Sequence, residues 1–399
     1  MRVAVITQTR ARVGGAESYL EMLLPALVDR HEVAFWSEPA ATEGRGVIAL
    51  PRTVQVLEPS APDPVSSLRA WRPDVLFAHG LHNPYVEDRL LGVAPAVAVE
   101  HTYHGTCISS AKTMRWPAVR ACTRQFGPAC LALYFPRRCG GLNPITMLRL
   151  YADQAARLAT LKRCAAVVTL SEHMRAELLR HGLEERQVRL VPPFVGPAAS
   201  TPRVPQAPGA ACRLLYFGRL EPLKGVDRLL AALPLVAGLL VRDVRLTVAG
   251  DGASRPELEA QAAGLRTRYP SVDVSFAGWQ DRTGRDRLLA DTDALVVPSL
   301  WPEPFGLVGL EAAAAGVPAV GFATGGIPEW LVDGETGCLA QAAGARPAAL
   351  ADAIVRCVRT PAALQKFSSG ALARAGRWTL ERHVRQIEDV LASAAGQVH

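Results

Sequence analysis

Two glutamates, Glu303 and Glu311, stand eight positions apart in the segment of this sequence that is richest in groups able to do chemistry. A strand pattern, Ala294 to Val297, precedes them, and we expect a helix from 306 to 315, so that the first carboxylate lies in a loop and the second in the helix. The free N–H groups and positive dipole end at the start of a helix favour phosphate oxygens, and Gly306 lets a phosphate approach the backbone closely. The segment therefore indicates a phosphate-containing ligand. Glu311 would accept from vicinal ribose hydroxyls, and Glu303 would project past the phosphates.

Two cations, Arg219 and Lys224, lie ahead of this segment in a loop bounded by Gly218 and Gly225. The planar guanidinium and the compact ammonium are not interchangeable, and together they suit an anionic ligand. On spacing alone, the alternative for Arg219 is a surface ion pair with Glu221.

Short β-branched runs alternate with helix-period segments along the chain, which is typical of βα units and parallel sheets. The strand patterns of the first half are Val3 to Thr7, Val33 to Trp36, Thr53 to Leu57, Val75 to Ala78, Ala96 to Glu100 and Ala165 to Leu170. Those of the second half are Arg213 to Phe217, Arg245 to Ala249, Val272 to Phe276, Ala294 to Val297 and Ala319 to Gly321. The helix patterns are 16–28, 145–163, 226–237, 255–263, 286–290, 306–315 and 380–392.

A proline-rich stretch divides this pattern into two halves, and we interpret residues 192–210 as an interdomain linker. The predicted domains are 1–191 and 211–376, with a final helix in 377–399 that packs back on the first domain. The predicted fold class is α/β, with two Rossmann-like doubly wound domains facing each other across a cleft. Doubly wound sheets bind ligands at the carboxyl ends of their strands, so that cleft is the expected site.

The glutamate segment, with the letters WPEPFGLVGLE, resembles the glutamate–seven residues–glutamate signature of the retaining GT-B glycosyltransferases, in their branch called glycosyltransferase group 1. Four further blocks match that family in order: GGAE from Gly14, GRLEPLKG from Gly218, AGDG from Ala249 and GGIPE from Gly325. The resemblance covers nearly the whole chain, and it assigns the acceptor to the domain 1–191 and the nucleotide sugar to the domain 211–376. It implies the GT-B fold and the transfer of a sugar from a nucleoside-diphosphate sugar with retention of configuration, by a front-face substitution. It implies no cofactor other than that donor, and no metal.

The resemblance also implies roles for matching residues. Arg219 and Lys224 would clamp the donor diphosphate. His101, at the end of a strand, would hydrogen-bond a sugar hydroxyl and help to place the acceptor, although a histidine at a strand end is often structural. With Glu303, these three form the expected catalytic group.

The remaining residues expected at the donor are Gly14, Gly15, Trp279, Phe305, Gly306, Leu307 and Glu311. The glycine pair would close over the diphosphate. Trp279 would either stack on the nucleobase or pack in the core.

The triplet Asp291-Thr292-Asp293 has the form of a metal-binding D-x-D motif, but it precedes a strand and we interpret it as a structural turn. Four cysteines, Cys107, Cys122, Cys130 and Cys139, gather in one stretch without any C-x-x-C pair, so reduced thiols are favoured over a metal site.

The net charge of +7 is concentrated in one region, because residues 105–152 contain no acid and seven arginines and lysines. Aromatic residues are interleaved with them in an insert of about 105–144 that follows His101. Such a surface suits anionic lipid headgroups or a diphosphate-bearing acceptor, and a solvated basic face is equally compatible with it. The expected partners are thus a nucleotide sugar and a lipid-linked glycan or other membrane acceptor of cell-surface polysaccharide synthesis, and not nucleic acid.

No apolar run approaches the ~20 residues that span a bilayer, and the sequence starts directly with a strand pattern. We therefore expect a cytoplasmic protein, with peripheral contact at the inner face of the plasma membrane. The alternatives are a soluble small-molecule acceptor, a GT-B-fold sugar-nucleotide epimerase, a nucleic-acid-binding protein and a non-catalytic sugar-nucleotide sensor.

Overall fold

The computed structural model describes residues 1–11, 15–38, 46–59, 63–196 and 211–396, which form two compact units. The first unit comprises Met1–Lys112, Thr123–Pro193 and Leu380–His399, and the second comprises Thr113–Cys122 and Phe194–Thr379. Most of the expected linker and Gly14 lie outside the described residues.

A parallel sheet in the order β3-β2-β1-β4-β5-β8-β9 forms the centre of the first unit. Its strands are β1 Arg2–Thr7, β2 Glu32–Ser37, β3 Gln55–Leu57, β4 Val75–Ala78, β5 Ala96–Glu100, β8 Ala166–Thr169 and β9 Val188–Leu190. The runs in β1, β4, β5 and β8 are buried along their length, as expected for strands that are covered on both faces.

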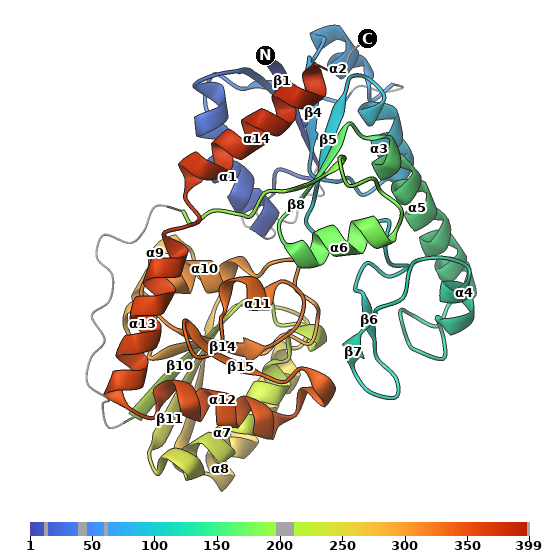
Figure 1. Cartoon of the computed structure of the whole chain (residues 1–399). Coiled ribbons are helices and arrows are strands. Elements are labelled where there is room, and N and C mark those ends of the chain that lie inside the picture. Colours follow the sequence, from blue (N-terminus) through green and yellow to red (C-terminus); the bar gives the residue numbers. More distant parts are fainter. Residues whose placement is uncertain (12–14, 39–45, 60–62, 197–210, 397–399) are drawn as a thin grey trace. The chain divides into compact units, whose positions relative to one another are not determined.

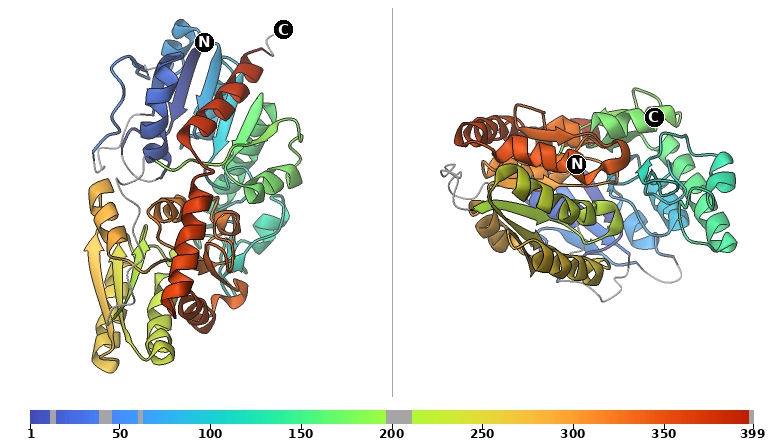
Figure 2. Two further views of the ribbon diagram at one scale, coloured as in Figure 1. Left: turned by 60° about the vertical axis from the view of Figure 1, so that its left-hand side comes forward. Right: turned by 90° about the horizontal axis from the view of Figure 1, so that it is seen from below.

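The helices of the first unit are α1 Gly15–Val28, α2 Ser66–Trp71, α3 Pro84–Leu91, α4 Ala129–Leu133, α5 Pro144–Arg163, α6 Glu172–Arg180 and α14 Leu380–Ala395. Two of them, α3 and α5, begin with the same Asn-Pro pair. Asn83 and Asn143 each accept hydrogen bonds from the next free N–H groups, and the proline occupies the first helical position. The C-terminal helix α14 lies along α1 and the sheet of the first unit (Figure 2).

The second unit repeats the architecture, with a parallel sheet in the order β12-β11-β10-β13-β14-β15. Its strands are β10 Ala211–Phe217, β11 Asp243–Ala249, β12 Val272–Gly278, β13 Ala294–Val297, β14 Ala319–Phe322 and β15 Gly337–Ala340. A short hairpin, β6 Thr113–Met114 and β7 Arg120–Ala121, groups with this unit.

The helices of the second unit are α7 Val226–Leu240, α8 Arg255–Arg268, α9 Arg282–Ala290, α10 Leu307–Ala314, α11 Ile327–Trp330, α12 Pro347–Val358 and α13 Pro361–Ala375. Figure 1 shows α7, α8 and α12 side by side against the sheet, where they enclose the main apolar core of the unit. Two 3-10 turns, η1 Pro222–Lys224 and η2 Ala343–Ala345, complete it.

The predicted fold class is confirmed, since both sheets are parallel and doubly wound. In each sheet the chain reverses its direction of travel next to the first strand, between β1 and β4 and between β10 and β13. At such a switch point the loops leave in opposite directions, and ligands bind at the carboxyl ends of the two strands. Lys224 follows β10 and Glu303 follows β13, so both lie on loops that leave the switch point of the second sheet.

Glycines hold the loops at this end of the second sheet together, backbone against backbone. A Cβ on Gly250 would lie 1.8 Å from the carbonyl oxygen of Gly218, and one on Gly225 would lie 2.0 Å from that of Pro298. Both glycines have positive φ, which residues with side chains rarely adopt. The loops after β10, β11 and β13 are therefore fixed relative to one another by contacts that no side chain would permit.

We predict that Gly250→Ala lowers the free energy of unfolding of the second unit by about 2–4 kcal/mol, because the new methyl must displace the Gly218 carbonyl. Thermal denaturation would measure the loss. The matched control is Gly238→Ala in α7, where a Cβ meets nothing within 4 Å and where alanine stabilises a helix by up to about 1 kcal/mol. Equal stability of the two variants would contradict the packing described here.

Candidate active site

Lys224 and Glu303 meet in the structure. The Nζ atom of Lys224 lies 2.7 Å from Oε1 of Glu303, and the ammonium also lies over the ring of Trp301, 4.7 Å from its centroid. The lysine side chain is 18% exposed and the glutamate side chain 9% exposed. The two groups are thus largely shielded from water, which strengthens their attraction.

Backbone contacts fix the position of Glu303. The N–H group of Gly326 donates to the Glu303 carbonyl at 2.7 Å, and a Cβ on Gly325 would lie 2.3 Å from the same oxygen. On the Lys224 side, the carbonyl of Leu223 accepts from the N–H groups of Leu300 and Trp301, at 2.9 and 3.1 Å. The block that begins at Gly325 therefore holds the backbone of Glu303 in place, and the loop after β13 is hydrogen-bonded to the turn that carries Lys224.

Arg219 lies apart from this pair. Its guanidinium forms a 2.6 Å ion pair with Glu221, and both side chains are exposed. This is the surface pairing that spacing alone left open. The backbone of the loop is anchored beneath it, because the buried hydroxyl of Tyr216 donates to the Arg219 carbonyl at 2.7 Å.

Glu311 lies in α10 and is paired with Arg285 of α9, which also contacts Asp286. Burial raises the pKa of Glu311, and the charge of Arg285 opposes that shift. The carboxylate expected to receive ribose hydroxyls is therefore held by a cation that sequence reasoning missed.

The helix that begins after Gly306 has the predicted geometry. Helix α10 starts at Leu307, and Gly306 precedes it with a φ of 96°. Phe305 is buried, and its carbonyl accepts from Nε1 of Trp330 at 2.6 Å. This indole also packs against Gly309, where a Cβ would lie 2.2 Å from its ring.

Two other expected donor contacts lie elsewhere. Trp279 follows the edge strand β12 and is 48% exposed, and Gly15 is the exposed first residue of α1 in the first unit. The roles predicted for them remain predictions.

Both aspartates of the D-x-D triplet are paired with one arginine. Arg213 contacts Asp291 at 2.5 Å and Asp293 at 2.9 Å, and its backbone N–H donates to Asp293 at 2.9 Å. These carboxylates tie β10 to the turn before β13. No group of three or more His, Cys, Asp or Glu side chains that could hold a metal ion occurs among the described residues, and all eight cysteines are free thiols.

In the first unit, His101 is part of a buried histidine pair. His101 follows β5 and His79 follows β4, and Nε2 of the first lies 2.9 Å from Nδ1 of the second. Burial lowers the pKa of His101 to about 4 and that of His79 well below its ordinary value. Both rings are therefore neutral at neutral pH, and one ring donates a single hydrogen bond to the other.

A series of buried side-chain contacts connects this pair to the C-terminal helix. The ring of Tyr19 packs edge-on against His101, and its hydroxyl lies 2.7 Å from Nε2 of His383 in α14. Nδ1 of His383 lies 2.7 Å from the carbonyl of Pro192. Since a carbonyl only accepts, Nδ1 carries the proton and Nε2 accepts from Tyr19. His383 thus ties α1 and α14 to the chain that leads out of β9.

The residues that sequence reasoning missed had recognisable signals in two cases. His79 ends a parallel strand just as His101 does, and adjacent strand ends meet at one edge of a sheet. His383 shares the apolar face of α14 with Ile387, which marks it as buried. Arg285 and Tyr216 had no such signal.

The structure offers two features for comparison with known proteins: two doubly wound sheets, and a lysine–glutamate pair at the switch point of the second. Over its length the chain resembles the crystal structure of HepE from Anabaena in complex with UDP and glucose, with a TM-score of 0.70, 19% identity and coverage of 98% of this chain and 100% of that one. This is the GT-B fold. Residues 211–360 match the family model described as glycosyl transferases group 1.

Curated relatives agree with that match. The chain is 30% identical to the glycogen synthase of Mycobacterium tuberculosis over 319 residues, covering 77% of this chain and 65% of the relative. It is 32% identical to the phosphatidyl-myo-inositol mannosyltransferase of Mycobacterium leprae over 204 residues, covering 50% of this chain and 52% of the relative. The chain thus spans between about half and two thirds of these relatives. Its second unit thus matches the group 1 glycosyltransferase family model, in a chain that has the GT-B fold.

Among the residues that the structure describes, no helix combines the length and apolarity needed to cross a membrane.

We predict that the first unit is most stable near pH 6–7 and loses stability on both sides of that range. Burial lowers the pKa of His101 and His383 to about 4 and of His104 to about 3, so their contribution is present above pH 6.5 and lost toward pH 4. Burial raises the pKa of Glu87 to about 7 and of Glu100 to about 8, so theirs is lost as the pH rises through 7–8.

A series of melting temperatures against pH would measure both slopes. In His383→Gln the acid slope should fall by at most about 1.4 kcal/mol per pH unit, the value for one titrating group, and Glu100→Gln should flatten the alkaline side instead. Glu100→Gln should also steepen the rise in stability between about pH 4.5 and 6.5, because the unfolded carboxyl already ionises near its ordinary pKa of 4.5. An unchanged alkaline slope in Glu100→Gln, or an unchanged acid slope in His383→Gln, would show that these groups do not titrate as described.

Proposed function

We propose that this protein is a retaining glycosyltransferase that moves a sugar from a nucleoside-diphosphate sugar to a hydroxyl of a lipid-linked glycan or another membrane-associated acceptor, in the synthesis of a cell-surface polysaccharide. The observation that carries the proposal is the Lys224–Glu303 pair at the switch point of the second sheet. The family match supports it, and so does the binding of UDP and glucose by the structural neighbour HepE.

The donor diphosphate would lie between Lys224 and the start of α10. A bound diphosphate brings more negative charge than Glu303 alone, so Lys224 would be shared between them. The N–H groups at the start of α10 would supply further donors. Arg219 would leave Glu221, an exchange that costs little because exposed ion pairs are weak. Glu303 would then be free to accept from a sugar hydroxyl.

The proposed reaction breaks the bond between the anomeric carbon and the phosphate oxygen and forms a bond from that carbon to the acceptor oxygen on the same face. The acceptor proton passes to the leaving phosphate. Lys224, Arg219 and the α10 dipole stabilise the charge that develops on the diphosphate, so the proposed reaction requires no divalent cation. A covalent intermediate on Glu303 is disfavoured, because retaining glycosidases use a second carboxyl group about 5 Å away, and the partner of Glu303 here is a lysine.

The first unit would serve the acceptor. His101 and His79 are neutral at neutral pH, and a neutral imidazole both donates and accepts, which suits recognition of hydroxyl groups. The basic, acid-free stretch from 105 to 152 favours a membrane-associated, anionic acceptor.

We predict that Lys224→Ala and Glu303→Ala each reduce turnover by on the order of 100-fold or more. The first change removes a cation that would stabilise the diphosphate, and the second removes a carboxylate that would accept from a sugar hydroxyl. The assay follows release of UDP, GDP or ADP from the matching sugar nucleotides with a bacterial membrane-lipid extract as acceptor, in excess EDTA. The product should carry the anomeric configuration of the donor, measured by NMR. Matched controls are Lys366→Ala and Glu335→Ala, which change exposed residues of the second unit.

Full turnover in either site variant, with the controls also active, would show that the pair does not form the site. A requirement for metal would direct attention back to Asp291 and Asp293. An inverted product would exclude the retaining mechanism, and interconversion of the donor without acceptor would indicate an epimerase.

A further inference from the structure

An apolar surface is exposed where the first unit is most basic. Residues 129–149, here called the α4–α5 tip, comprise α4, the turn that follows it and the first part of α5. Their exposed large side chains are Phe135, Leu142, Ile145 and Leu148, with exposed fractions of 36, 83, 76 and 56%. Large apolar side chains gathered at this exposure mark a binding surface rather than scattered surface residues.

The tip projects from the body of the unit. Every buried residue of α5 lies in its second half, from Gln154 onward, and α4 has no buried residue. Figure 1 shows α4 and the adjoining end of α5 at the margin of the first unit, away from its sheet, and Figure 2 shows the same from below. Ile145, Leu148 and Arg149 have the spacing that places side chains on one face of a helix. A core contact does not explain why these positions are apolar.

The turn inside the tip is ordered from within. Tyr134 is fully buried, and Gly140 packs against its ring, where a Cβ would lie 2.1 Å from the phenol oxygen. The Tyr134 carbonyl accepts from the N–H group of Cys139 at 2.9 Å. This internal packing leaves Phe135 and Leu142 on the outside.

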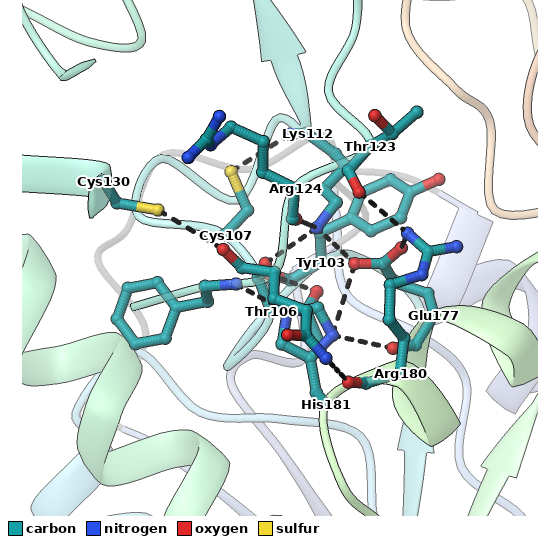
Figure 3. Close-up of polar contacts among 12 residues, drawn as sticks. Tyr103, Thr106, Cys107, Lys112, Thr123, Arg124, Cys130, Glu177, Arg180 and His181 are labelled. Carbon is teal, nitrogen blue, oxygen red and sulfur yellow. Dashed lines mark hydrogen bonds and ion pairs between the residues drawn. The ribbon is translucent and has the colours of Figure 1, made fainter. Parts of the chain in front are cut away.

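A buried ion pair secures the chain that leads to the tip (Figure 3). Lys112 is buried against Glu177 of α6, and its Nζ atom also donates to the carbonyls of Thr106 and Arg124, at 3.0 and 2.7 Å. Next in the chain, the N–H group of Phe126 donates to Nε2 of His181 at 2.8 Å. A buried lysine without these partners would be costly, so the base of the tip is fixed to α6.

The positive charge of the tip indicates which kind of partner it would bind. It carries Arg137, Arg138 and Arg149, and no acid occurs from 105 to 152. A second copy of the same surface would be repelled by like charges. A membrane with anionic lipids instead offers negative headgroups to the arginines and an apolar interior to the four exposed side chains.

We propose that the α4–α5 tip is a membrane-docking surface that inserts Leu142, Ile145 and Leu148 into the headgroup region of an anionic bilayer while its arginines contact the lipid phosphates. The proposal rests on the proposed function for its purpose, since a membrane-bound acceptor requires the enzyme at the membrane. The contact itself does not depend on turnover.

The test is co-sedimentation of the full chain with phosphatidylcholine vesicles, with and without about one third phosphatidylglycerol. We expect binding to the anionic vesicles only, weakened by high salt. Ile145→Glu with Leu148→Glu should reduce the partition coefficient about tenfold or more, and Arg137→Gln with Arg149→Gln should reduce it and remove most of its salt dependence. Matched controls are Leu239→Glu, an exposed leucine of α7, and Arg359→Gln, an exposed arginine after α12, neither of which should change binding.

Equal binding to both vesicle types, no binding to either, or unchanged binding by the tip variants would overturn the proposal. Dimers in sedimentation that the Ile145 and Leu148 changes convert to monomers would assign the surface to a second copy instead. Melting with and without nucleoside diphosphate, on the same variants, separates this proposal from the proposed function. If a tip variant no longer binds vesicles but nucleoside diphosphate still raises its melting temperature, the change affects the tip alone. If nucleoside diphosphate does not raise the melting temperature of the wild type, the proposed donor site is wrong and the tip proposal is unaffected.

Discussion

The candidate site depends on one constraint, the direct contact of backbones at the carboxyl end of the second sheet. Gly250 lies against the Gly218 carbonyl, Gly225 against that of Pro298, and Gly325 against that of Glu303. Such contacts leave no room for a Cβ, and they fix four loops from different strands in one arrangement. Lys224 and Glu303 are the side chains that this arrangement brings together, which explains why glycine blocks far apart in the sequence accompany the two charged residues.

Three cations of this end of the sheet are each paired with a carboxylate: Lys224 with Glu303, Arg219 with Glu221, and Arg285 with Glu311. Lys224 and Arg285 are largely shielded from water, and a shielded cation without a partner is costly, so Glu303 and Glu311 stabilise them. An incoming diphosphate would replace part of that pairing. Exposed pairs exchange easily and buried ones less so, so Arg219 is the adaptable member, and Lys224 is the one whose position the fold determines.

Fold class and most elements could be predicted from the sequence because the strands are continuous buried runs and the helices between them are periodic. The pattern predicted β13 at its observed bounds and α10 to within one residue at each end. It gave no helix at α13 and no strand at β15, because α13 has weak periodicity and β15 is short. It also gave no helix at α12, although Leu350, Ile354 and Val358 repeat there at helical spacing. In the site, residue types and motifs predicted Lys224 and Glu303. The partner of Arg219, Glu221, is the alternative that spacing alone offered. The partner of Glu311, the contact of His101 with His79 and that of His383 with Tyr19 arise from tertiary packing of distant segments, which local sequence does not encode. The helix α14 that carries His383 was predicted, but its histidine was not singled out.

The measurement that tests the central claim most directly is thermal denaturation with UDP, GDP and ADP in EDTA, on the wild type, Lys224→Ala, Arg219→Ala and Glu221→Gln. A ligand at one hundred times its dissociation constant adds about 2.7 kcal/mol of stability. The account predicts that one nucleotide stabilises the wild type, that Lys224→Ala abolishes this effect, that Arg219→Ala weakens it, and that Glu221→Gln preserves or increases it. A nucleotide shift that is the same in wild type and Lys224→Ala, or no shift with any nucleotide, would contradict the claim that this lysine–glutamate pair forms the donor site.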